Sequence, residues 1–320
     1  MRQTVSGILE ARPDILVIID SPAFTHSVAK RVAKKMPDLP IVDYVSPSVW
    51  AWKSWRAKQM ARFIDHVLAL LPFEPAVHRR LGGPPCTYVG HPLIEKQSLL
   101  LPAGVDRSLV KNPPVLLVLP GSRHSEIDRL TEAFGDAVSI VRQQYPDIEI
   151  ILPTVDHLRA KLEQMTANWP VRPKIVAGEV DKFAAFRKAD VALAASGTVT
   201  LELALAQVPM VVAYRVEWIG RQFKHLLKVP SIVLANLIIE DNVVPEFLDE
   251  HSDPQTLADN LLRLLQPGSE RDRQLAGFRT LEEKMRLPDG VAPSDKAAGI
   301  VIDILNSGKG DPQVRLDNGT

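Results

Sequence analysis

Short apolar runs alternate with longer segments of mixed polarity along most of this chain. Uninterrupted apolar runs of four to eight residues between turn signals are typical of strands buried inside a parallel sheet. Asp14–Asp20 is such a run and is expected to be buried on both faces. The strand segments predicted from this pattern are Asp14–Asp20, Ile41–Val45, His66–Leu71, Tyr88–Pro92, Val115–Leu119, Ile148–Leu152, Lys174–Ala177, Val191–Ala195 and Met210–Ala213.

The intervening segments carry apolar residues at helical spacing. Regular alternation of strand and helix predicts right-handed crossovers and parallel, doubly wound sheets. The predicted helices are Met1–Arg12, Ser21–Lys35, Glu126–Gln144, Asp156–Ala167, Lys182–Lys188, Val199–Ala206, Val243–Glu250, Pro254–Leu265, Glu270–Met285 and Ser294–Leu305.

The chain has 320 residues, which favours two domains. Residues 99–114 are rich in proline and polar residues and are interpreted as the linker. We therefore expect a first domain over residues 1–108, a second over 109–290, and a C-terminal helix with a polar tail over 291–320. The first domain offers only three or four strands, and a sheet this narrow leaves apolar edges bare.

The composition is ordinary for a soluble globular protein, with 46% hydrophobic and 24% charged residues. Lysine plus arginine equals aspartate plus glutamate at 38 each, so net charge gives no argument for nucleic acid as a partner. A single cysteine excludes an internal disulfide and fits a reducing compartment. No signal peptide and no apolar run of about 20 residues is present, so a cytoplasmic location is expected.

Two turns that follow predicted strands carry the features of an anion site. Ser196, Gly197 and Thr198 lie between an apolar run and a helix, where free backbone N–H groups favour a phosphate. Glu202, one turn into that helix, has the length to reach sugar hydroxyls.

The second turn follows Val115–Leu119. Its Gly121 lets the backbone approach a ligand, Ser122 follows, and Arg123 adds a forked donor for phosphate oxygens. Together the two turns suggest a nucleotide diphosphate site. The alternative is that both are ordinary strand–helix turns, with Ser125 and Glu126 serving only to cap the next helix.

Asp20 ends the first predicted strand, at the sheet edge where open α/β folds bind ligands. It is a candidate general base that accepts a hydroxyl proton. The competing interpretation is a helix-capping aspartate.

Trp50, Trp52 and Trp55 are interleaved with lysine and arginine, and Glu217–Lys228 has a similar composition. Both segments suit an amphipathic surface facing lipid head groups, although core packing explains aromatic residues equally well. His91 lies between Gly90 and Pro92, as either an exposed imidazole or a structural histidine.

Several common sites are not indicated by the sequence. The eight histidines are scattered and form no metal-ligand spacing with carboxylates or cysteine. The phosphate-loop pattern ending in Gly-Lys-Ser/Thr and the dinucleotide pattern Gly-x-Gly-x-x-Gly are both missing. Neither an NTPase nor a dehydrogenase is therefore expected, and no metal or cofactor is assigned.

Six segments, in order along the chain, resemble the lipid-A-disaccharide synthase family. The resemblance runs from about Asp14 to Leu305. The segments are Tyr44-Val-Ser-Pro-Ser-Val-Trp-Ala-Trp52, Leu71-Pro-Phe-Glu74, Val89-Gly-His-Pro92, Leu119-Pro-Gly-Ser-Arg123, Ala195-Ser-Gly-Thr198 with Leu201-Glu202, and Val211-Val-Ala-Tyr-Arg215.

This resemblance implies an inverting, metal-independent glycosyltransferase of the GT-B type, with two Rossmann-like domains. Such enzymes join UDP-2,3-diacylglucosamine to 2,3-diacylglucosamine 1-phosphate through a β-1,6 bond and release UDP. Their C-terminal domain holds UDP, and their last helix returns to the first domain. The expected location is the cytoplasmic surface of the inner membrane.

The same resemblance implies roles for individual residues. Asp20 matches an essential carboxylate and Arg123 an essential arginine. The donor-binding positions are Gly121, Ser122, Ser196, Gly197, Thr198, Glu202 and Asn236. The acceptor or membrane side is assigned to Trp50, Trp52 and His91.

One departure from the family concerns the beginning of the chain. The family normally opens with a strand and a Gly-Glu-x-Ser-Gly-Asp loop, which this sequence does not contain. A truncated N-terminal domain is therefore expected. The alternative functions are another GT-B enzyme acting on a UDP-sugar, such as an epimerase, and an inactive protein that only binds nucleotide sugars. The first alternative leaves the Trp-Ala-Trp segment unexplained.

Overall fold

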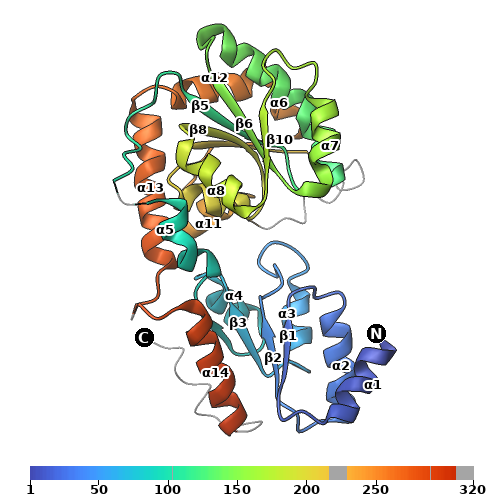
Figure 1. The fold of residues 1–320 in the computed structure, drawn as a ribbon. Helices are drawn as coiled ribbons and strands as arrows, with labels where there is room; N and C mark the ends of the chain where they lie inside the picture. Colours follow the sequence, from blue (N-terminus) through green and yellow to red (C-terminus); the bar gives the residue numbers. More distant parts are fainter. Residues whose placement is uncertain (103, 216–228, 289, 308–320) are drawn as a thin grey trace. The chain divides into compact units, whose positions relative to one another are not determined.

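A computed structural model describes residues 1–102, 104–215, 229–288 and 290–307 (Figure 1). The chain divides into two compact units. Unit 1 is built mainly from Met1–Glu95 and the C-terminal segment from Met285 onward. Unit 2 comprises Lys96–Lys224 and Pro230–Lys284. Each contains one parallel β-sheet, as the strand–helix alternation predicted.

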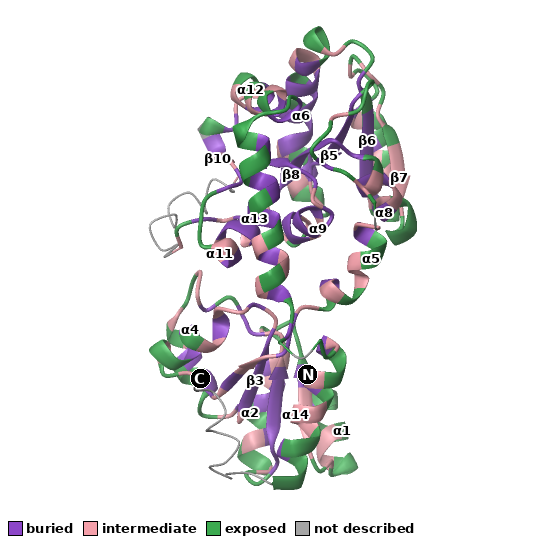
Figure 2. Cartoon of the chain, turned by 90° about the vertical axis from the view of Figure 1, so that its left-hand side faces the viewer, coloured by how far each residue is buried: buried purple, intermediate pink, exposed green. Residues whose placement is uncertain are grey.

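The sheet of unit 2 has six strands in the order β10-β9-β8-β5-β6-β7, and all neighbouring pairs are parallel. Every residue of the central strands β5 and β8 is buried (Figure 2). The strands are β5 (Val115–Leu119), β6 (Glu149–Thr154), β7 (Lys174–Ala177), β8 (Val191–Ala195), β9 (Met210–Tyr214) and β10 (Glu246–Leu248).

Helices α6 and α12 pack together against this sheet, and their apolar residues form one core cluster with β5, β8 and β9. The other helices of the unit include α11, which the sequence pattern did not reveal. The helices are α5 (Gln97–Leu100), α6 (His124–Gln144), α7 (Asp156–Met165), α8 (Glu179–Lys188), α9 (Val199–Leu205), α11 (Leu234–Ile239), α12 (Pro254–Leu264) and α13 (Ser269–Met285).

The segment interpreted as a linker packs onto unit 2. Arg107 is buried, and its guanidinium donates to the backbone carbonyls of Phe186 and Ala189. The buried Arg271 in turn donates to the carbonyl of Arg107 at 2.7 Å. Buried cations are stable only when hydrogen-bonded, so these contacts hold the backbone at Arg107 in place.

The prediction of a helix over Val243–Glu250 is wrong. The segment forms strand β10 followed by a short 3-10 helix, Asp249–His251. Glu246, Phe247 and Leu248 pair with Val212, Ala213 and Tyr214 at the edge of the sheet. Backbone pairing with β9 therefore overrides the local helical pattern.

The sheet of unit 1 has four parallel strands in the order β1-β2-β3-β4. Helices α3 and α4 were not predicted from the sequence. The elements are α1 (Arg2–Ala11), β1 (Leu16–Ile19), α2 (Thr25–Lys35), β2 (Ile41–Tyr44), α3 (Trp55–Met60), β3 (His66–Ala69), α4 (Glu74–Leu81), β4 (Cys86–Tyr88), the 3-10 helix η1 (Pro92–Lys96) and α14 (Pro293–Ser307).

Two helical layers cover this sheet. Apolar residues of α2, α3 and α4 form one cluster with the strands, and residues of α14 form another with β2 and β3 (Figure 1). Gly90, at φ 83°, allows close packing of the C-terminal segment, because a Cβ there would lie 2.8 Å from Pro293. The Tyr88 hydroxyl adds a hydrogen bond of 2.8 Å to the carbonyl of Met285.

The expectation that Asp14–Asp20 is buried on both faces is wrong. Strand β1 is the edge of the described sheet and has only one fully buried residue, Ile18. Ile19 is 62% exposed. An apolar run at an edge has fewer neighbours to cover it, and so β1 remains half-buried although its sequence resembles a central strand.

Candidate functional site

The two turns singled out in the sequence lie side by side in unit 2. Strands β5 and β8 are paired in parallel, and the turns follow the carboxyl ends of both. The chain proceeds from β5 outward to β6 and β7 and then returns to β8 on the other side of β5. This reversal of strand order is the position where open α/β sheets bind their ligands.

The turn after β8 contains backbone N–H groups that are available to a ligand. Within the described residues, the N–H groups of Gly197, Thr198 and Val199 donate no hydrogen bond. The Ser196 hydroxyl donates to the carbonyl of Ile232 at 2.8 Å and so fixes the start of the turn. Consecutive N–H groups of this kind suit phosphate oxygens.

Glu202 faces a cation that the sequence analysis did not identify. Both of its carboxylate oxygens accept from Lys182 Nζ, at 2.8 and 2.9 Å. Lys182 lies on α8, twenty residues away in sequence. The pair is partly buried, which holds Glu202 in one orientation beside the turn.

The turn after β5 is closed by a carboxylate. Glu126 accepts from the backbone N–H groups of Ser122 at 2.9 Å and Arg123 at 3.2 Å. A Cβ on Gly121 would lie 2.5 Å from Glu126, so this position requires glycine. Glu126 therefore does cap α6, as the alternative interpretation held, whereas Ser125 does not.

Arg123 is the N-cap residue of α6, and its side chain is 78% exposed. One guanidinium nitrogen donates to Glu126 at 2.8 Å. The other donors of the fork remain available to a ligand. An exposed ion pair of this kind contributes little to stability.

Asn236 lies on α11, in the segment between β9 and β10. Its side-chain amide is buried, accepts from the Val244 N–H at 2.9 Å and donates to the Val244 carbonyl at 2.9 Å. A further hydrogen bond of 3.3 Å joins it to the Ser231 hydroxyl. These contacts connect Asn236 to both Ser231 and Val244. The neighbouring Ile232 carbonyl accepts from the Ser196 hydroxyl, so Asn236 stabilises the loop that positions Ser196.

Asp20 follows β1 in unit 1 and is exposed. It has a positive φ of 48°, and the next residue, Ser21, has a φ of 47°. Two consecutive residues other than glycine in this region are strained, and such strain concentrates at functional sites. The helix-cap alternative is not what the structure shows, because α2 begins after Phe24 with no side-chain cap.

A buried histidine–aspartate pair lies near Asp20 and was missed in the sequence. His26 Nε2 and Asp43 Oδ2 are 2.8 Å apart. Burial raises the pKa of Asp43, and Asp20 raises it further, whereas His26 and Arg56 lower it. Asp43 Oδ1 has no hydrogen-bond partner among the residues that the structure describes. Asp43 could have been noticed in the sequence, because it is a charged residue in the middle of an apolar strand.

The segment Tyr44–Trp52 is held by buried groups of α4. Glu74 accepts from Trp50 Nε1 at 3.2 Å and from the Leu71 N–H at 3.0 Å. Burial raises the pKa of Glu74 to about 7. The Ser46 hydroxyl lies 2.9 Å from His78 Nε2, and burial lowers the pKa of His78 to about 4. Trp50 thus packs inside unit 1.

Trp52 and Trp55 are exposed, by 46% and 58%. Lys53 Nζ lies 3.9 Å from the ring centroid of Trp52. His91 is partly buried, and burial lowers its pKa to about 4. Its Nδ1 accepts from the Leu93 N–H at 3.2 Å, so the ring is neutral and fixed near neutral pH.

The basic aromatic segment Glu217–Lys228 lies outside the described residues. Among the residues that are described, no helix combines the length and apolar character needed to cross a bilayer. That part of the chain also contains no group of three or more histidine, cysteine, aspartate or glutamate side chains placed to hold a metal ion.

Comparison with known proteins identifies the family. Residues 1–295 match the family model described as lipid-A-disaccharide synthetase. The chain is 52% identical over 314 residues to the lipid-A-disaccharide synthase of Nitrobacter winogradskyi, covering 97% of this chain and 78% of that protein. Its identity to the Nitrobacter hamburgensis enzyme is 50% over 315 residues, with the same coverage.

Solved structures agree on the fold. The chain is similar to a Staphylococcus aureus MnaA structure containing UDP, with a TM-score of 0.63, 14% identity, and coverage of 96% of this chain and 79% of that one. For MurG from Acinetobacter baumannii the TM-score is 0.54 at 13% identity, covering 95% and 76%. The parallel sheets, the six matching segments and these relatives lead to one conclusion: the chain has a GT-B fold and belongs to the lipid-A-disaccharide synthase family of glycosyltransferases.

Proposed function

We propose that this chain transfers a 2,3-diacylglucosaminyl group from UDP to 2,3-diacylglucosamine 1-phosphate, forming a β-1,6 bond with inversion and releasing UDP. Membership of the synthase family supports the substrates. The observation that carries the site is the pairing of β5 and β8, which places both sequence-predicted turns at the switch point of one sheet.

In this proposal the donor diphosphate lies over the two turns of unit 2. The backbone around Ser196, Gly197 and Thr198 supplies N–H donors to one phosphate. Gly121 and Ser122 form the other wall of the diphosphate site. Glu202, oriented by Lys182, accepts hydrogen bonds from ribose hydroxyls. The UDP bound to the S. aureus MnaA fold supports a nucleotide in this kind of sheet.

Asp20 and Arg123 carry the chemistry. The Asp20 carboxylate accepts the proton of the acceptor 6-hydroxyl as that oxygen attacks C1 of the donor sugar from the face opposite UDP. The bond from C1 to the phosphate oxygen breaks, and its electron pair leaves with UDP. Arg123 stabilises the charge that develops there, because its exposed guanidinium keeps donors free. Asn236 acts as a positioning residue.

The acyl chains of both substrates place the reaction at a membrane surface. We infer peripheral binding to the inner membrane from the exposed Trp52 and its lysine neighbour. The fixed, neutral His91 belongs to the acceptor side in this scheme, as a hydrogen-bonding group rather than a cation.

The decisive assay supplies both diacylated substrates in detergent micelles and follows the products by mass spectrometry and NMR. We expect a disaccharide 1-phosphate with a β-anomeric linkage and one equivalent of UDP. The control reaction omits the acceptor. Release of UDP at the same rate without an acceptor, epimerisation of the donor, or an α linkage would contradict the proposal.

A further inference from the structure

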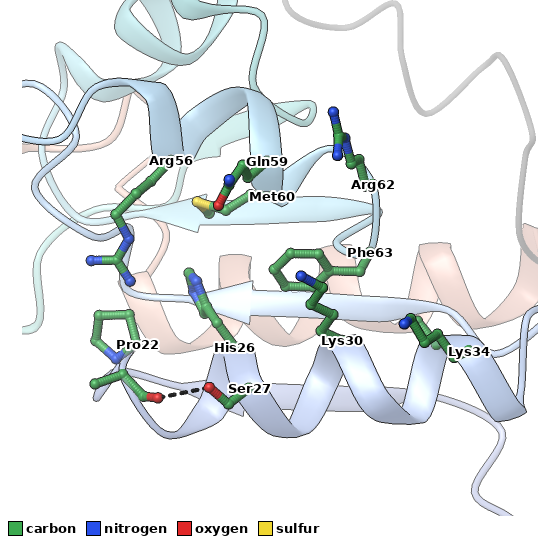
Figure 3. A pocket seen from close by; sticks show the side chains of 12 residues that line it. Pro22, His26, Ser27, Lys30, Lys34, Arg56, Gln59, Met60, Arg62 and Phe63 are labelled. Atoms are coloured by element: carbon green, nitrogen blue, oxygen red, sulfur yellow. Dashed lines mark hydrogen bonds between the residues drawn. The ribbon is translucent and has the colours of Figure 1, made fainter.

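Unit 1 contains a groove that the proposed reaction does not use. It runs between α2 and the segment from α3 to Phe63 and encloses about 540 Å³ (Figure 3). It lies in the helical layer of unit 1, and all of its lining residues belong to that unit. Its lining begins at Pro22, just before α2, and extends to Lys34 in the last turn of that helix.

Four cations line this groove, two on each wall. Lys30 and Lys34 are one helical turn apart on α2, and Arg56 and Arg62 come from the facing segment. Figure 3 shows Arg56 at the end near Pro22, and Arg62 with Lys34 at the other end. Within the described part of the chain, the side chains of these four residues form no ion pair or hydrogen bond, and Arg56 acts only at longer range on the buried Asp43, whose pKa it lowers. Positive charge concentrated in a cleft attracts anions.

The groove also has apolar surface. Met60 and Phe63 contribute to its lining, and His26 extends into it with its ring edge-to-face to Phe63, at 5.8 Å between centroids. The cations on both walls can bind phosphates, and the apolar groups between them can contact apolar portions of the same molecules. This combination matches a row of phosphate head groups. A single small phosphate would use only one end of the groove.

Two exposed aromatic residues are neighbours in sequence of residues at the Pro22 end of the groove. Trp55 is 58% exposed and precedes the groove residue Arg56, and Phe24 is 41% exposed and follows the groove residue Ala23. Aromatic side chains beside cations are the usual composition of surfaces that lie at the membrane–water interface. This arrangement favours phosphate on a lipid over free phosphate.

We propose that the groove between α2 and α3 binds phosphate head groups of anionic phospholipids, with Lys30, Lys34, Arg56 and Arg62 as ligands. This inference rests on the peripheral membrane contact of the proposed function and assigns that contact to specific residues. The aromatic residues at the groove's end enter the interface, while the cations hold individual head groups.

Flotation of the full chain with vesicles tests this assignment. The vesicles contain either phosphatidylcholine alone or phosphatidylcholine with 30% phosphatidylglycerol. The variant Lys30→Gln/Arg62→Gln removes one cation from each wall. The matched control, Lys35→Gln/Arg80→Gln, removes two exposed cations of unit 1 that lie outside the groove. Thermal melting confirms that both variants fold.

We expect the groove variant to lose affinity for phosphatidylglycerol vesicles by about fivefold for each cation removed. The control variant should change much less. Equal losses in both variants would mean general charge attraction and would overturn the proposal. Displacement of the wild type from vesicles by millimolar inorganic phosphate, at constant ionic strength, would identify a free-phosphate site and also overturn it.

The same proteins separate this inference from the proposed reaction. Vesicle binding is measured without donor or acceptor, and transfer is measured in detergent. Specific vesicle binding in a protein that forms no disaccharide would remove the reaction and keep the groove. Formation of the disaccharide by a protein that shows no preference for anionic vesicles would keep the reaction and remove the groove.

Discussion

The two units have the same architecture but differ in how many neighbours each strand has. In unit 2 the predicted turns follow two central strands whose residues are all buried. In unit 1 Asp20 follows β1, an edge strand in the described sheet, and its neighbour Ile19 is exposed. Similar apolar runs thus reach different burial, because cover comes from adjacent strands and helices rather than from the run itself.

The units also differ in how their charges are satisfied. Glu202 and Glu126 in unit 2 each face a basic partner, at 2.8 Å in both cases. In unit 1, neither the Asp20 carboxylate nor any of the four groove cations forms an ion pair within the described residues. Paired groups hold a binding turn in a fixed shape, whereas unpaired groups are available to react or to bind ligands.

Asp20→Asn is expected to have the largest effect and tests the unpaired side of this contrast. The carboxamide keeps the shape but not the basicity, so transfer should fall by about a thousandfold, or roughly 4 kcal/mol in the barrier. Affinity for UDP-sugar should be unchanged. Single-turnover rates and calorimetric donor binding measure the two effects separately. A parallel collapse of donor affinity would indicate a structural aspartate.

Paired alanine substitutions in the strands test the difference in burial. Leu117→Ala removes a fully buried side chain from β5 and should cost about 3 kcal/mol of unfolding free energy. Ile19→Ala, at the exposed end of β1, should cost less than about 1 kcal/mol. Urea denaturation followed by circular dichroism provides both values. Equal losses would show that β1 is covered as well as β5 is.

Arg123→Ala tests whether an exposed residue of unit 2 acts in catalysis. Its guanidinium is mostly exposed, so the melting temperature should hardly change. Loss of a charge-assisted donor to the leaving UDP should raise the barrier to transfer by roughly 3 kcal/mol or more. Arg123→Lys, which keeps the charge but not the fork, is the matched comparison. Wild-type turnover in the alanine variant would exclude Arg123 from the site.

The last prediction concerns the pH dependence of stability and Glu74, whose pKa is raised to about 7 by burial. A carboxyl group with a raised folded-state pKa binds its proton more tightly in the folded chain. Its contribution to stability is therefore greatest below about pH 4.5 and is lost as pH rises to about 7. This change should be on the order of 3 kcal/mol.

Glu74→Gln is the control for that titration, because an amide does not ionise in this pH range. Its single oxygen keeps one of the two hydrogen bonds that Glu74 accepts, from Trp50 at Oε1 and from the Leu71 N–H at Oε2. Urea midpoints of both proteins between pH 5 and 8 measure the effect. We expect the wild type to lose stability relative to the variant as pH rises. Parallel pH profiles would show that Glu74 does not titrate in this range.

Much of the architecture was predictable because it depends on local pattern. The predicted strands Val115–Leu119, Lys174–Ala177 and Val191–Ala195 agree with the structure at both ends. Each is an apolar run bounded by polar or turn-forming residues, so its limits are set within a few residues. The family was likewise identified from short contiguous segments, which need no knowledge of the fold.

What only the tertiary structure decided depends on residues far apart in the chain. The pattern could not show that β8 returns to lie beside β5, or that Glu246–Leu248 pairs with β9. It also could not join His26 to Asp43, or Lys182 to Glu202. Burial, pairing and charge compensation are properties of neighbours in space, and the chain acquires those neighbours only on folding.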